Sequence, residues 1–171
     1  MPRYAAFLRG VSPTNAKMPD VKRAFETAGF TNVATIISSG NVVFDADSRS
    51  TPVVEKKAEA AMRTILGRSF TVIARPVELI ERLLASDPYR TANVPAEAKR
   101  VVTFVRTAPA TAPKLPMAQD GATIVAYKDG MAFTAYVPSA KGPVFMTLID
   151  KAFGKDQTTR TWQTLEKVVG R

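Results

Sequence analysis

The sequence contains no cysteine and no histidine. Without cysteine, the chain has no disulfide, no thiolate nucleophile and no Cys-ligated zinc or iron–sulfur cluster. Without histidine, it lacks the commonest general base and the commonest transition-metal ligand, so any catalysis must use other side chains. The carboxylates show no calcium-loop spacing. We therefore expect neither a metal nor a cofactor.

Long hydrophobic runs are missing as well. No apolar segment approaches the roughly 18 residues that cross a bilayer, and the opening MPRYAAFLRG lacks the apolar region and cleavage site of a signal peptide. We therefore expect a soluble, cytoplasmic protein with no membrane partner. The 171 residues are 46% hydrophobic and 23% charged, which is typical of a globular chain with a sizeable core in one or two domains.

Acidic residues are few relative to basic ones. The chain has 24 Lys and Arg against 15 Asp and Glu, a formal charge of +9. A surface of this sign favours anionic partners such as nucleic acid, nucleotides or acidic proteins. The basic residues are spread along the chain without a block of five or six, so solubilising surface charge is the alternative interpretation.

The apolar patterns of the first 74 residues predict the order strand, helix, strand, strand, helix, strand. The helices are expected to begin near Pro19 and at Thr51-Pro52, because proline suits the first helical turn. A turn at Ser39-Gly40 joins the middle strands, which we expect at 33–37 and 41–44, into a hairpin. This order is that of a ferredoxin-like split βαβ unit, in which an antiparallel sheet carries both helices on one face.

The second half repeats this pattern loosely. A helix from Pro76 and a connection lead to an expected strand at 101–105, followed by a stretch broken by three prolines. Lys128-Asp129-Gly130 then predicts a hairpin, and helices are expected from Pro143 and from near Thr161.

The predicted fold class is therefore α+β, a ferredoxin-like antiparallel sheet with helices packed on one face, in two related subdomains. We place the first subdomain at 1-75, a helix and linker at 76-99, and the second α+β subdomain at 100-171. One continuous sheet is the alternative.

Signature motifs of nucleotide-binding loops, serine hydrolases, zinc proteases and RNA-recognition strands are missing from the sequence. Two segments of the first half nevertheless concentrate polar groups. Arg9 ends an apolar strand, where it suits an anion or a carboxylate. Ser39 and Asn41 belong to the segment SSGN, whose hydroxyl and amide groups suit an oxyanion. A sheet-edge salt bridge and a plain hairpin are the respective structural alternatives.

A third polar segment, TTRTWQT at 158–164, contains Arg160 and the only tryptophan, Trp162. We place it at the start of a helix, where free N–H groups and the helix dipole favour anions. The alternative is that Thr161 caps this helix while Trp162 fills the core.

Residues 8–44, LRGVSPTNAKMPDVKRAFETAGFTNVATIISSGNVVF, and the later run TAYVPSAKGPVFMTLIDKAFGKDQTTRTWQTLEKV resemble the two signatures of a bacterial family known as domain of unknown function 1697, DUF1697. The likeness covers nearly the whole chain. It implies an α+β fold with ferredoxin-like subdomains and implies no established activity. The commoner form of the family has Asn on both sides of the Trp, where this chain has Thr161 and Gln163.

Our leading hypothesis is binding of an anionic ligand, either a nucleotide or nucleic acid. Its side chains would come from all three polar segments and from one loop lysine: Arg9, Ser39, Asn41, Lys141, Arg160 and Trp162. The hypothesis requires that these segments converge in space.

Two other classes of function stay open, and with them the question of whether the protein is an enzyme. One is a transferase or hydrolase acting on a phosphorylated substrate, for which Asp45 and Asp150 are the acidic residues nearest two of the motifs. The other is a protein-interaction module in which the motifs are purely structural.

Overall fold

The computed structural model describes residues 1–36 and 40–171. These residues fall into two compact units. Unit 1 combines Met1–Arg82 with Glu166–Arg171, and unit 2 is Leu83–Leu165. The chain passes from one unit to the other within helices α3 (Val77–Ser86) and α5 (Trp162–Val169). The predicted division at 1-75, 76-99 and 100-171 stays a prediction.

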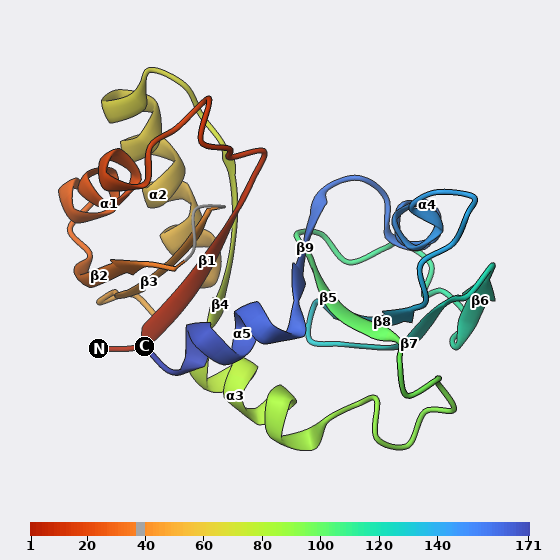
Figure 1. Cartoon of the computed structure of the whole chain (residues 1–171). Helices are drawn as coiled ribbons and strands as arrows, with labels where there is room; N and C mark the ends of the chain where they lie inside the picture. Colours follow the sequence, from red (N-terminus) through yellow and green to blue (C-terminus); the bar gives the residue numbers. More distant parts are fainter. Residues whose placement is uncertain (37–39) are drawn as a thin grey trace. The chain divides into compact units, whose positions relative to one another are not determined.

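Unit 1 has the element order expected from its sequence (Figure 1). The elements are β1 (Arg3–Arg9), α1 (Met18–Thr27), β2 (Thr31–Thr35), β3 (Asn41–Asp45), α2 (Thr51–Leu66) and β4 (Thr71–Pro76). The four strands form an antiparallel sheet in the order β2-β3-β1-β4. β1 lies inside this sheet because five consecutive residues of the strand are buried, which suits a position with cover on both faces.

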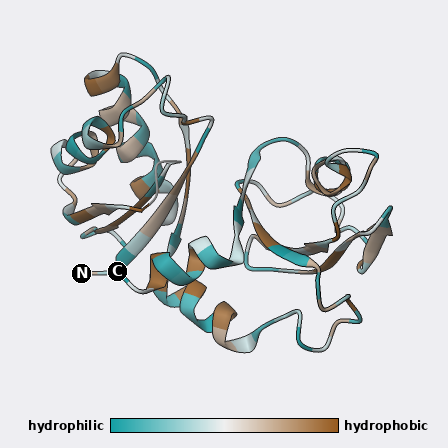
Figure 2. Cartoon of the chain, in the orientation of Figure 1, coloured by the Kyte–Doolittle hydropathy of each residue, from teal (hydrophilic) through white to brown (hydrophobic). Residues whose placement is uncertain are grey.

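Helices α1 and α2 cover the same face of this sheet (Figure 1). Alternate residues of β1 meet the apolar stripes of both helices in one core, which includes Tyr4, Ala6, Leu8, Val21, Phe25, Val54, Ala58 and Met62. Figure 2 shows hydrophobic and hydrophilic stretches alternating along α2 and α3, as in amphipathic helices. Proline lies in the first turn of α1 and of α2, as predicted.

Unit 2 is built around a second sheet. Its elements are β5 (Lys99–Val105), β6 (Met117–Gln119), β7 (Ala122–Lys128), β8 (Met131–Tyr136), α4 (Val144–Phe153) and β9 (Gln157–Thr161). The strands are antiparallel in the order β6-β7-β8-β5-β9. α4 packs against β6 and β7. Because the described residues form two separate sheets, the alternative of one continuous sheet is wrong, and the α+β fold class is confirmed.

Two hairpins of unit 2 are closed by the same dipeptide. Asp129-Gly130 joins β7 to β8 as predicted, with φ of 54° and 75°. Asp120-Gly121 joins β6 to β7, with φ of 46° and 87°. Positive φ at both central residues is what a type I′ turn requires. The second hairpin was not predicted, because β6 ends the proline-broken stretch that we expected to be irregular.

The segment before α5 differs from its prediction. Residues 158–160 do not begin a helix, because they belong to strand β9, which pairs with β5 from Val101 to Val105. α5 begins at Trp162, close to the predicted start. Within the described residues, none of the helices combines the length and the apolar character that crossing a membrane requires.

Candidate functional site

Unit 2 contains a groove of about 760 Å³. It follows the connection between α3 and β5 and reaches the start of α5. Its charged lining consists of three cations, Arg90, Lys99 and Arg100, and two carboxylates, Asp87 and Glu97. The groove is therefore polar and slightly cationic.

Lys99 and Arg100 are neighbours in β5, so their side chains leave opposite faces of the sheet. Lys99 is the direct cross-strand partner of Tyr136, and Arg100 is the partner of Ala135. Both nevertheless line the groove, because they occupy the first positions of β5, where the sheet ends. Two cations on opposite faces of one strand thus both line the groove.

Arg100 is held against aromatic rings. Its guanidinium carbon lies 4.9 Å from the ring centre of Trp162 and 5.6 Å from that of Tyr89. One guanidinium nitrogen is 3.8 Å from a carboxylate oxygen of Asp87. Cation–π contact orients a guanidinium while the charge is retained. Arg100 is therefore a positioned cation rather than a freely rotating one.

Tyr89 holds in place the part of the groove that contains Arg100. Its hydroxyl donates to the carbonyl of Val101 at 2.6 Å and lies 3.2 Å from the carbonyl of Thr134. Its ring meets that of Trp162 edge to face, with centroids 5.4 Å apart. Burial raises the pKa of the Tyr89 phenol well above its ordinary value. Tyr89 therefore stays neutral and ties the connection to the sheet.

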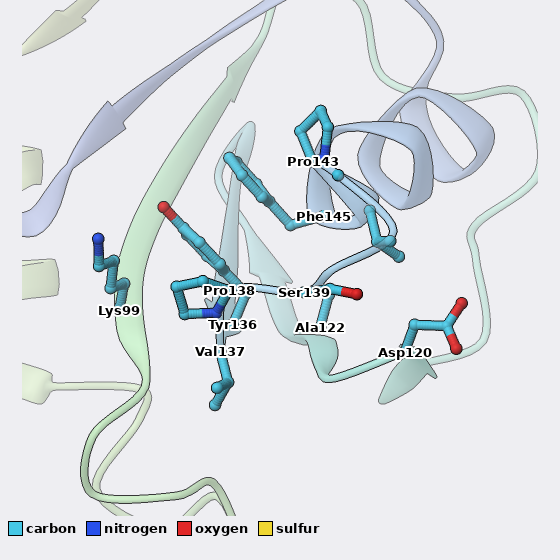
Figure 3. Close-up of a pocket in the computed structure, with 11 residues that line it drawn as sticks. Lys99, Asp120, Ala122, Tyr136, Val137, Pro138, Ser139, Pro143 and Phe145 are labelled. Carbon is cyan, nitrogen blue, oxygen red and sulfur yellow. The ribbon is translucent and has the colours of Figure 1, made fainter.

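A smaller pocket of about 270 Å³ shares Lys99 and Tyr136 with the groove (Figure 3). The Tyr136 ring stacks on Phe145 of α4, with centroids 3.9 Å apart and planes inclined by 9°. Asp120, from the β6–β7 turn, also lines the pocket. In Figure 3, Lys99 lies on one side of the aromatic pair and Asp120 on the other.

Two of the three predicted site residues of unit 1 are described by the structure, and they differ in burial. Arg9 is exposed at the end of β1. Asn41 is fully buried, and its side-chain amide donates to the carbonyl of Ile36 at 3.0 Å, while the Ile36 N–H donates to the Asn41 carbonyl at 2.9 Å. Asn41 thus helps to hold the β2–β3 hairpin together. Ser39 lies outside the described residues.

The other predicted site residues belong to unit 2. Trp162 is buried against Tyr89 and Arg100, and the Thr161 hydroxyl accepts from the Thr164 N–H at 3.2 Å, so the expected structural roles of Trp162 and Thr161 are both present. Lys141 is exposed and pairs with Asp120 at 3.2 Å. The predicted convergence of all three segments stays a prediction.

Arg160 is a half-buried residue of β9. Its guanidinium donates to the Thr158 hydroxyl and to the Thr159 carbonyl. Burial lowers the pKa of this guanidinium to about 10, because a charged group loses hydration in the protein interior. Arg160 still carries a positive charge at neutral pH.

The groove was not predicted, because residues 89–98 resembled a simple connection. The available signal was one aromatic residue and three cations at the two ends of this proline-containing stretch: Tyr89, Arg90, Lys99 and Arg100. Nothing in their spacing indicates that Trp162, more than sixty positions later, packs on Arg100.

The fold and the groove define an α+β protein of two antiparallel sheets with a polar, slightly cationic hollow in its second unit. A family model described as "Protein of unknown function (DUF1697)" matches residues 1–133. The chain belongs to this family, as the resemblance of its sequence motifs predicts.

A solved structure shares the fold. It is described as the structure of the conserved bacterial protein SP0830 from Streptococcus pneumoniae. The two chains are 17% identical, the TM-score is 0.74, and the match covers 99% of this chain and 97% of the other. At this identity the likeness concerns the fold alone. The comparison with curated proteins gave no match.

Proposed function

We propose that this protein binds a phosphate-bearing anion in the groove of unit 2. The observation that carries the proposal is the positioned cation Arg100, stacked on Trp162 and Tyr89, beside Lys99 at the end of β5. An ordered guanidinium is well suited to phosphate, because its N–H groups form paired hydrogen bonds in a fixed plane. Lys99 leaves the opposite face of β5 but also lines the groove, so it adds a second positive charge to the same hollow.

The net charge of the chain supports the same assignment. A formal charge of +9 attracts anions over distances of about 8–10 Å at moderate salt. The carboxylates Asp87 and Glu97 also line the groove, so a small anion held at its cations fits better than a polyanion that covers the whole surface. We therefore assign a small phosphorylated molecule rather than nucleic acid.

The test uses the single tryptophan as a reporter. Because Trp162 contacts Arg100 directly, an anion that binds Arg100 is expected to change the fluorescence of this residue. The probes are ribose 5-phosphate, AMP, GMP and a ten-nucleotide oligouridylate, with thermal unfolding measured in parallel. A probe at about 100 times its Kd adds about 2.7 kcal/mol to the free energy of unfolding.

Two variants locate the binding. The double change Lys99→Ala with Arg100→Met removes both charges and keeps an unbranched side chain against Trp162, so we expect the response to disappear. Lys151→Ala is the control, because Lys151 is an exposed residue of α4 that lines neither the groove nor the small pocket. The fluorescence response of this variant should match that of the unchanged protein. A response that persists in the double variant, or no response to any probe, would refute the proposed function.

The salt dependence separates the two ligand classes. A small anion held by about two cations loses affinity modestly with salt, whereas a single-stranded nucleic acid gives a slope of log K against log[salt] near −0.7 for each phosphate neutralised. Tight oligouridylate binding with a steep slope would therefore contradict the assignment to a small molecule.

A further inference from the structure

The small pocket beside the groove has opposite charges at its two ends. Lys99 lies on one side of the Tyr136–Phe145 ring pair, and the carboxylate of Asp120 lies on the other (Figure 3). Lys99 also lines the groove, so the pocket and the proposed anion site adjoin at this residue. A ligand that continues from the groove into this pocket meets a cation first, then aromatic rings, then a carboxylate.

The aromatic pair is a rigid platform. Tyr136 ends β8, Phe145 lies in the first turn of α4, and their rings stack almost in parallel. Both side chains are half-buried, and Pro138 and Pro143 line the same pocket. Flat aromatic faces of this kind stack with nucleobases in many binding sites, largely independently of base identity.

Asp120 is the residue of this pocket that distinguishes one base from another, which stacking on aromatic rings does not do. It occupies the β6–β7 turn with φ of 46°, and one carboxylate oxygen accepts from Lys141 at 3.2 Å. The Asp120 side chain is 35% exposed, and Lys141 is 71% exposed. A carboxylate is an acceptor only, so it pairs with N–H groups such as the exocyclic amino group of a base.

We propose that the ligand is a nucleoside monophosphate whose base carries an amino group. The base lies in the small pocket against Tyr136 and Phe145, its amino edge faces Asp120, and its phosphate lies at Lys99 and Arg100. This inference rests on the proposed function, because the groove supplies the phosphate site. Guanine is the best match, since its ring N–H and amino group both donate on one edge and suit the two oxygens of a carboxylate.

The test compares the affinities of GMP, UMP and ribose 5-phosphate by isothermal titration calorimetry. We expect GMP to bind about tenfold more tightly than ribose 5-phosphate through stacking. We also expect GMP to bind several-fold more tightly than UMP, whose base has no amino group. Asp120→Asn should bring GMP to the affinity of UMP and leave ribose 5-phosphate unchanged.

A matched control is available in the neighbouring hairpin. Asp129 also occupies the first position of an Asp-Gly turn, with φ of 54°, and lines neither hollow. Asparagine tolerates this backbone conformation, so both substitutions preserve their turns. Asp129→Asn is expected to keep the preference for GMP over UMP at its original value.

The outcomes separate the two proposals. Equal affinities for GMP and ribose 5-phosphate would overturn the base-binding inference and leave the phosphate site standing. A GMP preference that survives Asp120→Asn would overturn the assigned role of this carboxylate. Failure of all three probes to bind would refute the proposed function itself, and the inference with it.

Discussion

Gly40, in the segment SSGNVVF, is constrained by both its backbone and its surroundings. It is buried with φ of 83°, a conformation that L-residues with a side chain rarely adopt. A Cβ atom there would lie 3.1 Å from the Leu8 Cβ and 3.2 Å from the Val11 Cβ. The Gly40 carbonyl accepts from the Leu8 N–H at 2.9 Å, so the backbone is fixed in place. Close packing of the hairpin against β1 therefore requires glycine at this position.

We expect Gly40→Ala to destabilise unit 1 by about 2–4 kcal/mol, the sum of left-handed backbone strain and steric crowding. Gly67→Ala is the matched control, because Gly67 has φ of 75° but no atom within 4 Å of an added Cβ. That control should cost only about 1 kcal/mol. Urea denaturation measures both values, and equal losses would show that crowding at Gly40 is unimportant.

At the scale of elements, helix α2 protects the edge strand β4. β4 is the last strand of its sheet, so backbone N–H groups on its outer side have no neighbouring strand to pair with. The Glu55 carboxylate accepts from the Ala74 N–H at 2.8 Å, and the Glu59 carboxylate accepts from the Val72 N–H at 3.2 Å. Two carboxylates one helical turn apart thus accept hydrogen bonds from the N–H groups of alternate residues of β4.

Glu55→Leu removes a buried acceptor and should lower the free energy of unfolding by about 1–3 kcal/mol. Glu55→Gln retains an acceptor oxygen and should cost less. Glu59→Leu is the comparison, because Glu59 is half-buried and water replaces its oxygen more readily. If Glu55→Leu and Glu59→Leu have equal effects on chemical denaturation, burial is not what makes the Glu55 hydrogen bond important.

Elements with regular apolar patterns or specific turn residues were predictable. The hairpin at Asp129-Gly130 and the helices with proline in their first turn lie close to their expected positions. Strand β9, QTTRT, was missed because it has no apolar alternation. Pairing with β5 stabilises it, and its hydroxyls bond across strands, as Thr159 does with Thr103 at 2.8 Å.

The candidate site was less predictable than the fold. Trp162 and Lys141 are predicted site residues, and each contacts a residue that lines a hollow of unit 2, Arg100 and Asp120 respectively. Arg100 and Asp120 themselves were not among the predicted site residues. Arg100 becomes notable only through its contact with Trp162, a long-range contact that one sequence does not reveal. Asp120 was discoverable, because Asp-Gly is the same turn signal that identified the neighbouring hairpin.

At the scale of the whole molecule, unit 1 is discontinuous in sequence, because unit 2 lies between its two parts. Arg3 of β1 joins several segments of unit 1. Its guanidinium donates to the carbonyl of Arg171 at 3.1 Å, to that of Asn32 at 3.2 Å and to the Asp45 carboxylate at 3.0 Å. The final residues of the sequence are thus tied directly to the first strand.

The pH dependence of stability should report on this network. Hydrogen bonds from the Asn32 amide and from Arg3 lower the pKa of Asp45 in the folded state, while burial acts in the opposite direction. A lowered folded pKa stabilises the protein above the unfolded value of about 4, and this stabilisation is lost as pH falls further. Asp45→Asn should therefore destabilise the protein at pH 7 and have a smaller effect near pH 3.

Urea denaturation at the two pH values measures this difference, with Asp47→Asn as an exposed control two residues away. If Asp45→Asn lowers the free energy of unfolding by the same amount at both pH values, Asp45 has no electrostatic role in stability.

The insertion of unit 2 within unit 1 has a consequence for synthesis on the ribosome. Translation proceeds from the N-terminus, so β1 to β4 emerge first and all of unit 2 emerges before residues 166–171. These last residues include Val168, which is buried, and Arg171, which bonds Arg3. The nascent chain therefore contains every residue of its second unit while its first unit is still unfinished.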